Sequence, residues 1–348
     1  MIIIILIIMK LFIFLFTVLS TSNGLSVPSF FKYWHCVGIN NNIDYSKPYK
    51  YNIGELPLVL WQDTTGNLIS TVNICKHMGA TIDKGAVIDG CIQCPYHGFE
   101  HTKNDKFGET IIHEGKIFWS YEPKNSIPTK IPGFDFYNFE HSIIQIDMDA
   151  GMNDCAYNTM DLNHPEFVHT GIFGFGTSEK PKDVKTFKYE DRVAIYFKYK
   201  AKKTIQFFHK YEQETDNQNV FVYPSSGWSK VTTNSANKLI IGFNFLPISE
   251  NKTRWFITII HNYYKATSFE KEIFTFLTKQ ILNQDRNQMK IQMKDNKLKE
   301  LVMFKKYLQN DDAIKLVKES MKQYKYPNID DCVKLYDAYL KNHKRDLY

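Results

Sequence analysis

The chain has 348 residues, of which 43% are hydrophobic and 23% are charged, and its formal net charge is +6. These values predict a globular protein with room for two domains and exclude an intrinsically disordered chain. Lysines occur throughout without a dense basic run, so no nucleic-acid partner is expected. The six cysteines are not spaced as in a disulfide-bonded scaffold, so we expect the protein to lie in a reducing compartment.

Residues 1–22 are almost entirely apolar, and Lys10 is the one charged side chain among them. About 20 apolar residues can span a bilayer, although a lysine near the centre costs about 2.5–3.5 kcal/mol. A cleaved signal segment is the alternative, with small residues at Ser20–Ser22 but no basic start. We therefore interpret residues 1–22 as a hydrophobic membrane anchor or signal segment.

Residues 30–132 contain short apolar and β-branched runs separated by glycines, a pattern typical of a small all-β domain. A connector that contains Pro123, Pro128 and Pro132 follows it. The predicted strands are Tyr51–Ile53, Leu58–Trp61, Leu68–Ile74, Ile111–Ile112 and Lys116–Tyr121.

Two Cys-plus-His pairs lie inside this domain. Cys75 and His77 form the first pair, and Cys94 and His97 form the second after a gap of sixteen residues. In a Rieske 2Fe–2S cluster two thiolates hold one iron and two imidazoles hold the other. Structural zinc sites are the alternative, but they usually place Cys with Cys and His with His in each half. One Cys and one His in each half favours the cluster.

Residues 133–310 are predicted to form a second domain around an antiparallel sheet. Its high aromatic content suits a curved sheet that encloses an apolar pocket. From Ser268 the apolar residues recur at helical spacing, and residues 311–348 are expected to be a C-terminal helical extension. The predicted strands are Ser142–Met148, Thr186–Lys200, Thr204–Tyr211, Asn219–Val222, Leu239–Leu246 and Arg254–Tyr264.

A second constellation of polar side chains lies between these strands. Asp161 and His164 would share one face of a helix, and His169 would lie about 140° away if that helix continued. Pro165 disfavours the α conformation at His164 and allows the chain to turn there. Both imidazoles could then bind one ion, although hydrogen-bonded histidines on a surface loop are the common alternative.

In this order the two motifs resemble the Rieske-type mononuclear non-haem iron oxygenases, the superfamily of ring-hydroxylating oxygenase α-subunits, over about residues 30–300. The resemblance implies an α+β fold, with an N-terminal all-β Rieske domain and a catalytic domain with a helix-grip-like antiparallel sheet. It also implies that His164 and His169 bind a mononuclear Fe(II). Asp161 would link this iron to a Rieske cluster, usually that of a neighbouring subunit.

The sequence departs from the family pattern at three positions. Tyr157 stands where the family often has Glu, Phe99 stands where it often has Trp, and His164 is unusual in directly preceding Pro165. Respiratory and photosynthetic Rieske proteins carry an extra cysteine in each ligand loop, where this chain has Gly79-Ala80 and Tyr96. The first motif therefore resembles the oxygenase type.

A facial triad requires a carboxylate besides two histidines. The resemblance puts it on the long helix after the sheet, where Asp285 is the candidate, with Glu270 and Glu272 as alternatives. Asp285 lies about 40° from Ile281 around that helix, at the edge of the apolar face. A solvated acid next to Arg286 is the competing interpretation.

The resemblance implies an oxygen-dependent enzyme. The 2Fe–2S cluster would pass electrons to the iron, and dioxygen as co-substrate would hydroxylate or desaturate a large apolar substrate. A ferredoxin or an NAD(P)H-dependent reductase would supply electrons, and a homotrimer is expected. The single-chain layout is similar to pheophorbide a and chlorophyllide a oxygenases and to sterol 7-desaturases. An electron-transfer Rieske protein and a degenerate, ligand-binding oxygenase are the alternatives.

Secretion suits a thiolate-held iron cluster poorly. We therefore expect residues 1–22 to remain as an anchor in an endoplasmic-reticulum or plastid-type membrane, with the other domains on a reducing side.

Overall fold

The computed structural model describes residues 27–133, 139–169, 180–201, 213–232, 238–261, 268–292 and 310–342, and a few positions between 299 and 308. Ser29–Asn328 form one compact unit, and the residues on either side of it form another, in which helix α7 (Ile329–Asn342) is described. The predicted anchor, residues 1–22, lies outside the described residues. Within the described ranges no helix is long and apolar enough to cross a membrane.

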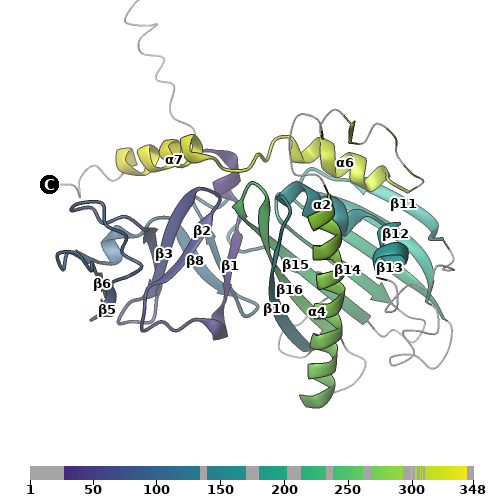
Figure 1. Ribbon diagram of the computed structural model, residues 1–348, viewed down its shortest axis with the longest axis horizontal. Helices are drawn as coiled ribbons and strands as arrows, with labels where there is room; N and C mark the ends of the chain where they lie inside the picture. The colour runs from purple at the N-terminus through teal and green to yellow at the C-terminus, as the bar shows by residue number, and fades with distance from the viewer. Residues whose placement is uncertain are drawn as a thin grey trace, which may run out of the picture. The chain divides into compact units, whose positions relative to one another are not determined.

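The N-terminal part of the larger unit consists of three small antiparallel sheets, as expected for the all-β domain. The sheets are β1-β9-β8, β2-β3-β4 and β5-β6-β7 (Figure 1). The strands are β1 (His35–Ile39), β2 (Tyr49–Ile53), β3 (Leu56–Gln62), β4 (Leu68–Val72), β5 (Ala86–Ile88), β6 (Cys91–Gln93), β7 (Glu100–His101), β8 (Glu109–His113) and β9 (Lys116–Ser120). Short 3-10 helices are η1 (Ser29–Lys32), η2 (Asn40–Asn42) and η3 (Lys103–Asp105).

Two buried tryptophans fix the loops between these sheets. The indole N–H of Trp61 donates to the carbonyl oxygen of Gly90 at 2.9 Å, and that of Trp119 donates to the carbonyl oxygen of Phe107 at 2.8 Å. Both indoles are fully buried, so each contributes apolar area while its polar atom is satisfied. Trp61 packs in a cluster with Val59, Ile69, Ile82, Ile92 and two of the predicted ligands, Cys75 and Cys94.

The C-terminal part of the unit is a seven-stranded antiparallel sheet in the order β10-β16-β15-β14-β13-β12-β11. Helix α2 packs against β13, β15 and β16, and α4 packs against β10, so that both lie on one face of the sheet (Figure 1). This arrangement confirms the predicted fold class. The strands are β10 (Glu140–Met148), β11 (Lys182–Lys188), β12 (Arg192–Ala201), β13 (Gln213–Val222), β14 (Ser226–Thr232), β15 (Lys238–Ser249) and β16 (Lys252–His261), and the helices are α2 (Met152–Met160), α3 (His164–Val168), α4 (Ser268–Ile291) and α6 (Asp312–Met321).

The single strand predicted over Thr186–Lys200 is wrong. The chain turns between Lys188 and Arg192, and the backbone N–H of Tyr189 donates to the carbonyl oxygen of Arg192 at 2.8 Å. β11 and β12 are therefore the two arms of a hairpin. Strand β14 was not predicted, and the predicted strand Thr204–Tyr211 lies outside the described residues.

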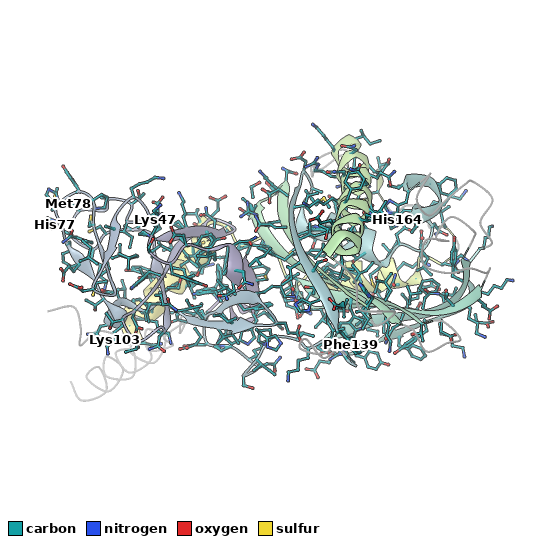
Figure 2. All side chains as sticks on the ribbon, turned by 90° about the horizontal axis from the view of Figure 1, so that it is seen from below. Lys47, His77, Met78, Lys103, Phe139 and His164 are labelled. Carbon is teal, nitrogen blue, oxygen red and sulfur yellow. The ribbon has the colours of Figure 1, made fainter. Side chains whose placement is uncertain are left out.

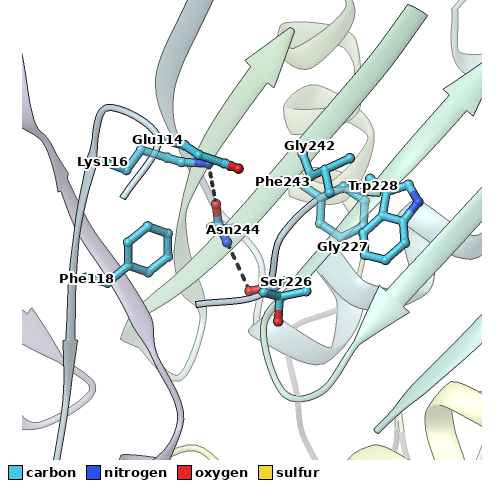
Figure 3. Close-up of a pocket in the computed structure, with 11 residues that line it drawn as sticks. Glu114, Lys116, Phe118, Ser226, Gly227, Trp228, Gly242, Phe243 and Asn244 are labelled. Carbon is cyan, nitrogen blue, oxygen red and sulfur yellow. Dashed lines mark hydrogen bonds between the residues drawn. The ribbon is translucent and has the colours of Figure 1, made fainter. Parts of the chain in front are cut away.

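The small sheets and the large sheet are joined by a buried ammonium group. Lys116, at the start of β9, is 3% exposed, and its Nζ donates to Asn244 Oδ1 and to Thr258 Oγ1, each at 3.0 Å. Asn244 in turn donates from Nδ2 to Ser226 Oγ at 3.0 Å (Figure 3). The domain boundaries near residues 132 and 310 remain predictions.

Candidate metal centres

The loops that carry the two Cys-plus-His pairs have the same backbone geometry. The N–H of Cys75 donates to the carbonyl oxygen five residues later, on Ala80, and the carbonyl of Cys75 accepts from Gly79 N–H. Cys94 repeats both bonds with Phe99 and Gly98, over distances of 2.7–3.0 Å in all. Gly79 and Gly98 have φ of +75° and +72°, a backbone region that glycine adopts without strain. The two ligand loops therefore have equivalent backbone conformations.

Each loop presents a buried thiol and an exposed imidazole. Cys75 and Cys94 are 3% and 4% exposed, within the apolar cluster around Trp61. The rings of His77 and His97 are exposed, with centroids 4.8 Å apart, and Figure 2 shows His77 at the outer end of the small sheets. Two thiols on the inner side and two imidazoles on the outer side fit the donor set of a Rieske cluster.

Residues that the sequence reasoning missed support these loops. Asn73 is buried, and its Oδ1 accepts from the backbone N–H groups of Ile82 and Asp83, both at 2.9 Å. Lys76 forms an ion pair with Asp105, which also accepts from Thr102 N–H at 2.8 Å. No sequence signal marks these residues, because each meets its partner only once the loops are folded.

Asp161 and His164, which were predicted to share one face of a helix, instead lie on a turn between two helices. α2 ends at Met160, and Asp161 has extended backbone angles (φ −81°, ψ 115°). Its carboxylate accepts from the backbone N–H groups of Asn163 at 2.7 Å and His164 at 3.3 Å. The expected break at His164 is wrong as well, because α3 begins at that residue with Pro165 in its first turn. A proline there costs the helix no hydrogen bond.

The structure brings His164, His169 and Asp285 together. Asp285 Oδ1 lies 3.6 Å from His164 Nε2 and 3.4 Å from His169 Nε2. One donor atom from each residue lies within 4.8 Å of the other two. Asp285 is 5% exposed on α4, so it is not the solvated acid of the competing interpretation. Of the alternatives, Glu272 is exposed, and the Glu270 side chain lies outside the described residues.

Hydrogen bonds at the outer nitrogens direct both imidazoles toward the carboxylate. His164 Nδ1 lies 2.9 Å from the carbonyl oxygen of Asp161, and His169 Nδ1 lies 3.2 Å from Gln284 Oε1. If each Nδ1 carries the proton, each Nε2 is left with a free lone pair for a metal. Asn158 Nδ2 donates to Asp285 Oδ1 at 3.4 Å. Gln284 was missed by the sequence reasoning, although it directly precedes the candidate ligand.

The electrostatics of this site favour a cation. Burial raises the pKa of Asp285 to about 7. Burial also lowers the pKa of His164 to about 4, and burial together with the adjacent His164 imidazole lowers that of His169 to about 4. Two neutral imidazoles and one carboxylate held in a buried place are the donor set of a facial-triad iron site. Asp161 lies next to this site, and burial raises its pKa as well.

Comparisons with known proteins agree with this geometry. Residues 33–111 match the model of the Rieske [2Fe-2S] domain, and residues 148–322 match that of the vanillate O-demethylase oxygenase C-terminal domain. These two domains imply a 2Fe–2S cluster and a mononuclear iron that reacts with dioxygen, and both donor sets described above fit them.

Curated relatives and solved structures are similar over parts of the chain. Chlorophyllide a oxygenase of Oryza sativa is 26% identical over 169 residues, which are 43% of this chain and 31% of the relative. The oxygenase component of 3-ketosteroid-9-alpha-monooxygenase from Rhodococcus rhodochrous is 24% identical over 172 residues, 42% of this chain and 45% of the relative. The alignments span less than half of either relative.

Among solved structures, dicamba monooxygenase bound to 3,6-dichlorosalicylic acid superposes with a TM-score of 0.72. It is 15% identical in sequence, and the superposition covers 84% of this chain and 96% of that one. This likeness shows a shared fold. With half of its length matched by the oxygenase C-terminal domain and a Rieske domain before it, the chain belongs to the Rieske-type non-haem iron oxygenases.

Proposed function

We propose that this protein is the oxygenase component of a multicomponent system that hydroxylates or desaturates a large apolar substrate. The observation that carries the proposal is the convergence of His164, His169 and Asp285 at one buried point. An electron-transfer Rieske protein has no use for a second donor set of this kind. Iron held there would supply the dioxygen chemistry.

The residues of the chain act by holding and orienting. Cys75, His77, Cys94 and His97 would hold the cluster, and His164, His169 and Asp285 would hold the iron, which would supply the reaction with dioxygen. Asp161 shares its turn with His164, which suits a role in linking the iron to the cluster of a neighbouring subunit. In Figure 2 His77 and His164 lie in different parts of the unit, so a homotrimer would supply that cluster from a second chain.

The substrate class rests on the layout and on the relatives. Chlorophyllide a oxygenase and 3-ketosteroid-9-alpha-monooxygenase have names that refer to large, mostly apolar molecules. We extend this to a pheophorbide- or chlorophyllide-like compound or a sterol. Electrons would come from a ferredoxin or an NAD(P)H-dependent reductase. Attachment of residues 1–22 to an endoplasmic-reticulum or plastid-type membrane, with the metal centres on a reducing side, completes the proposal.

Iron analysis with product detection tests the proposal. The purified full chain should hold about three iron atoms, since a 2Fe–2S cluster accounts for two and the triad for one. His164→Ala and His169→Ala should each lose one iron and all oxygen-dependent turnover. His141→Ala, a histidine on β10 whose Nδ1 lies near the Phe139 carbonyl oxygen, serves as the matched control.

Turnover is followed as product mass with reduced protein and a panel of sterols and chlorophyll catabolites. Two irons per chain in the wild type, with a normal cluster spectrum, would contradict the proposal and favour an electron-transfer Rieske protein. Three irons without oxygen consumption on any member of the panel would favour a degenerate, ligand-binding oxygenase.

A further inference from the structure

Asn163 lies in the turn between α2 and α3 and contacts two carboxylates through two different groups. Its backbone N–H donates to Asp161 Oδ1 at 2.7 Å. Its side-chain amide donates from Nδ2 to Asp311 Oδ1 at 3.2 Å. The residue therefore connects the turn that carries Asp161 and His164 to a segment 148 positions later in the chain.

The use of the Asn163 side chain is unusual for its position. Asn163 precedes α3, where an asparagine normally caps the helix with its own side-chain oxygen. No such bond is made here. The bond that the side chain does make with Asp311 is a tertiary one, donated by Nδ2.

Asp311 is a fixed acceptor. It is 9% exposed and directly precedes α6, which packs against α2. Its Oδ2 accepts from the backbone N–H of Leu308 at 2.8 Å, and its carbonyl oxygen accepts from Lys315 N–H at 3.0 Å. The bond from Leu308 fixes the orientation of the Asp311 carboxylate, so that Oδ1 is the oxygen presented to the Asn163 amide.

We infer that Asn163 and Asp311 are positioning residues that set the direction of the Asp161 carboxylate and the His164 imidazole relative to Asp285. The inference deepens the proposed function and rests on it. Asp161 and His164 leave the same short turn, so a rotation of that turn moves the iron ligand and the linking carboxylate together. Small displacements of this kind strongly reduce rates that depend on alignment. Electron transfer to the iron site should therefore depend on the Asn163–Asp311 bond more than iron binding does.

The test uses the full-length holoprotein with four changes: Asn163→Ala, Asp311→Ala, Asp311→Asn and the double change Asn163→Asp with Asp311→Asn. The first two remove the bond. Asp311→Asn retains an oxygen acceptor, and the double change reverses donor and acceptor. Iron content is measured first, and then the electron paramagnetic resonance spectrum of nitric oxide bound at the ferrous site. Stopped-flow absorption follows oxidation of the reduced cluster in oxygenated buffer, and the part of this rate that His164→Ala abolishes is the iron-dependent rate.

We expect all four variants to retain iron. Asn163→Ala and Asp311→Ala should lower the iron-dependent rate about tenfold and change the nitric oxide spectrum. Asp311→Asn and the double change should recover most of the rate. Asp154→Asn is the control, because it breaks a partly buried ion pair between Asp154 on the same helix α2 and Lys299 (2.8 Å) and leaves the turn untouched. It should lower thermal stability without changing the rate or the spectrum.

Equal rates and spectra in Asn163→Ala, Asp311→Ala and wild type would overturn the inference. So would a loss of thermal stability like that of Asp154→Asn with an unchanged rate, since that marks a purely structural bond. If wild-type protein itself shows no iron-dependent oxidation of the cluster, the proposed function fails, and this inference fails with it.

Discussion

The ammonium of Lys116 lies 3.0 Å from the amide oxygen of Asn244, a residue 128 positions later in the chain, and both side chains are buried. Burial lowers the pKa of Lys116, because a charged ammonium is less stable away from water. The two oxygen acceptors around its Nζ offset this cost and hold the group between the small sheets and the large sheet. The pair thus connects the part of the fold with the cluster loops to the part with the triad.

Removal of this ammonium should destabilise the protein. Lys116→Met retains most of the aliphatic stem but leaves Asn244 Oδ1 and Thr258 Oγ1 without this donor. An unsatisfied buried polar group costs about 1–3 kcal/mol. We expect a clear fall in the urea unfolding midpoint, measured by tryptophan fluorescence. Lys47→Met, at a side chain that is 77% exposed, should leave the midpoint nearly unchanged, and equal midpoints for both variants would contradict the assigned role.

Cys91 provides a matched control for the cluster thiols. Cys75→Ser and Cys94→Ser should abolish the visible absorption of the 2Fe–2S centre and lower the iron content from about three to about one atom per chain. Cys91 is half-buried and lies outside both ligand loops, so Cys91→Ser should retain the spectrum and the iron. If Cys91→Ser lost the cluster and the other two variants retained it, the assignment of Cys75 and Cys94 as the thiolate ligands would be wrong.

Metal binding at the triad should weaken as the pH falls through about 7. The pKa of Asp285 is raised to about 7, so in metal-free protein this carboxyl is protonated below that pH and must release its proton before it binds a metal. The pKa values of His164 and His169, about 4, keep both imidazoles neutral over the same range. Titration with Co(II) at pH 6 and pH 8, followed by visible absorption, should give weaker binding and release of about one proton per ion at pH 6. A constant affinity for Co(II) from pH 8 down to pH 5 would contradict the raised pKa of Asp285.

Gly108 allows a comparison of backbone strain with steric overlap. Gly108 has φ of +78°, and a Cβ atom built there lies 2.6 Å from the indole of Trp119. Gly133 has φ of +72°, with nothing within 4 Å of its Cβ position. Gly133→Ala should cost about 1–2 kcal/mol from the left-handed backbone alone. Gly108→Ala should cost about 1–3 kcal/mol more because it also overpacks the core, and thermal unfolding of both variants checks the difference.

Local patterns predicted the parts of the fold that depend on short stretches of chain. The spacing of Cys75, His77, Cys94 and His97 identified two loops that the structure shows to have equivalent backbone hydrogen bonds, and their role as cluster ligands stays a prediction. The small strands follow from β-branched runs between glycines. Asp285 was identified as a candidate from its place on a helix, and that helix does bring it to the two histidines.

The errors of the sequence reasoning also have physical causes. The hairpin between β11 and β12 was missed because its turn contains charged residues and no glycine or proline, so neither of the two residues that most strongly indicate a tight turn marks it. The turn at Asp161–His164 was missed because helical spacing cannot reveal a carboxylate that accepts from the next backbone N–H groups. Lys116–Asn244 and Asn163–Asp311 join residues more than a hundred positions apart, and no periodicity reports such contacts.

Iron bound by His164, His169 and Asp285 would also act as a cross-link. His169 and Gln284, the neighbour of Asp285, are 115 positions apart, so the ion would close a long loop that contains most of the seven-stranded sheet. Closure of so long a loop restricts the unfolded chain strongly. Iron loss should therefore end the chemistry and also make α4 more susceptible to proteases. The stability of a preparation should then depend on how much iron it contains.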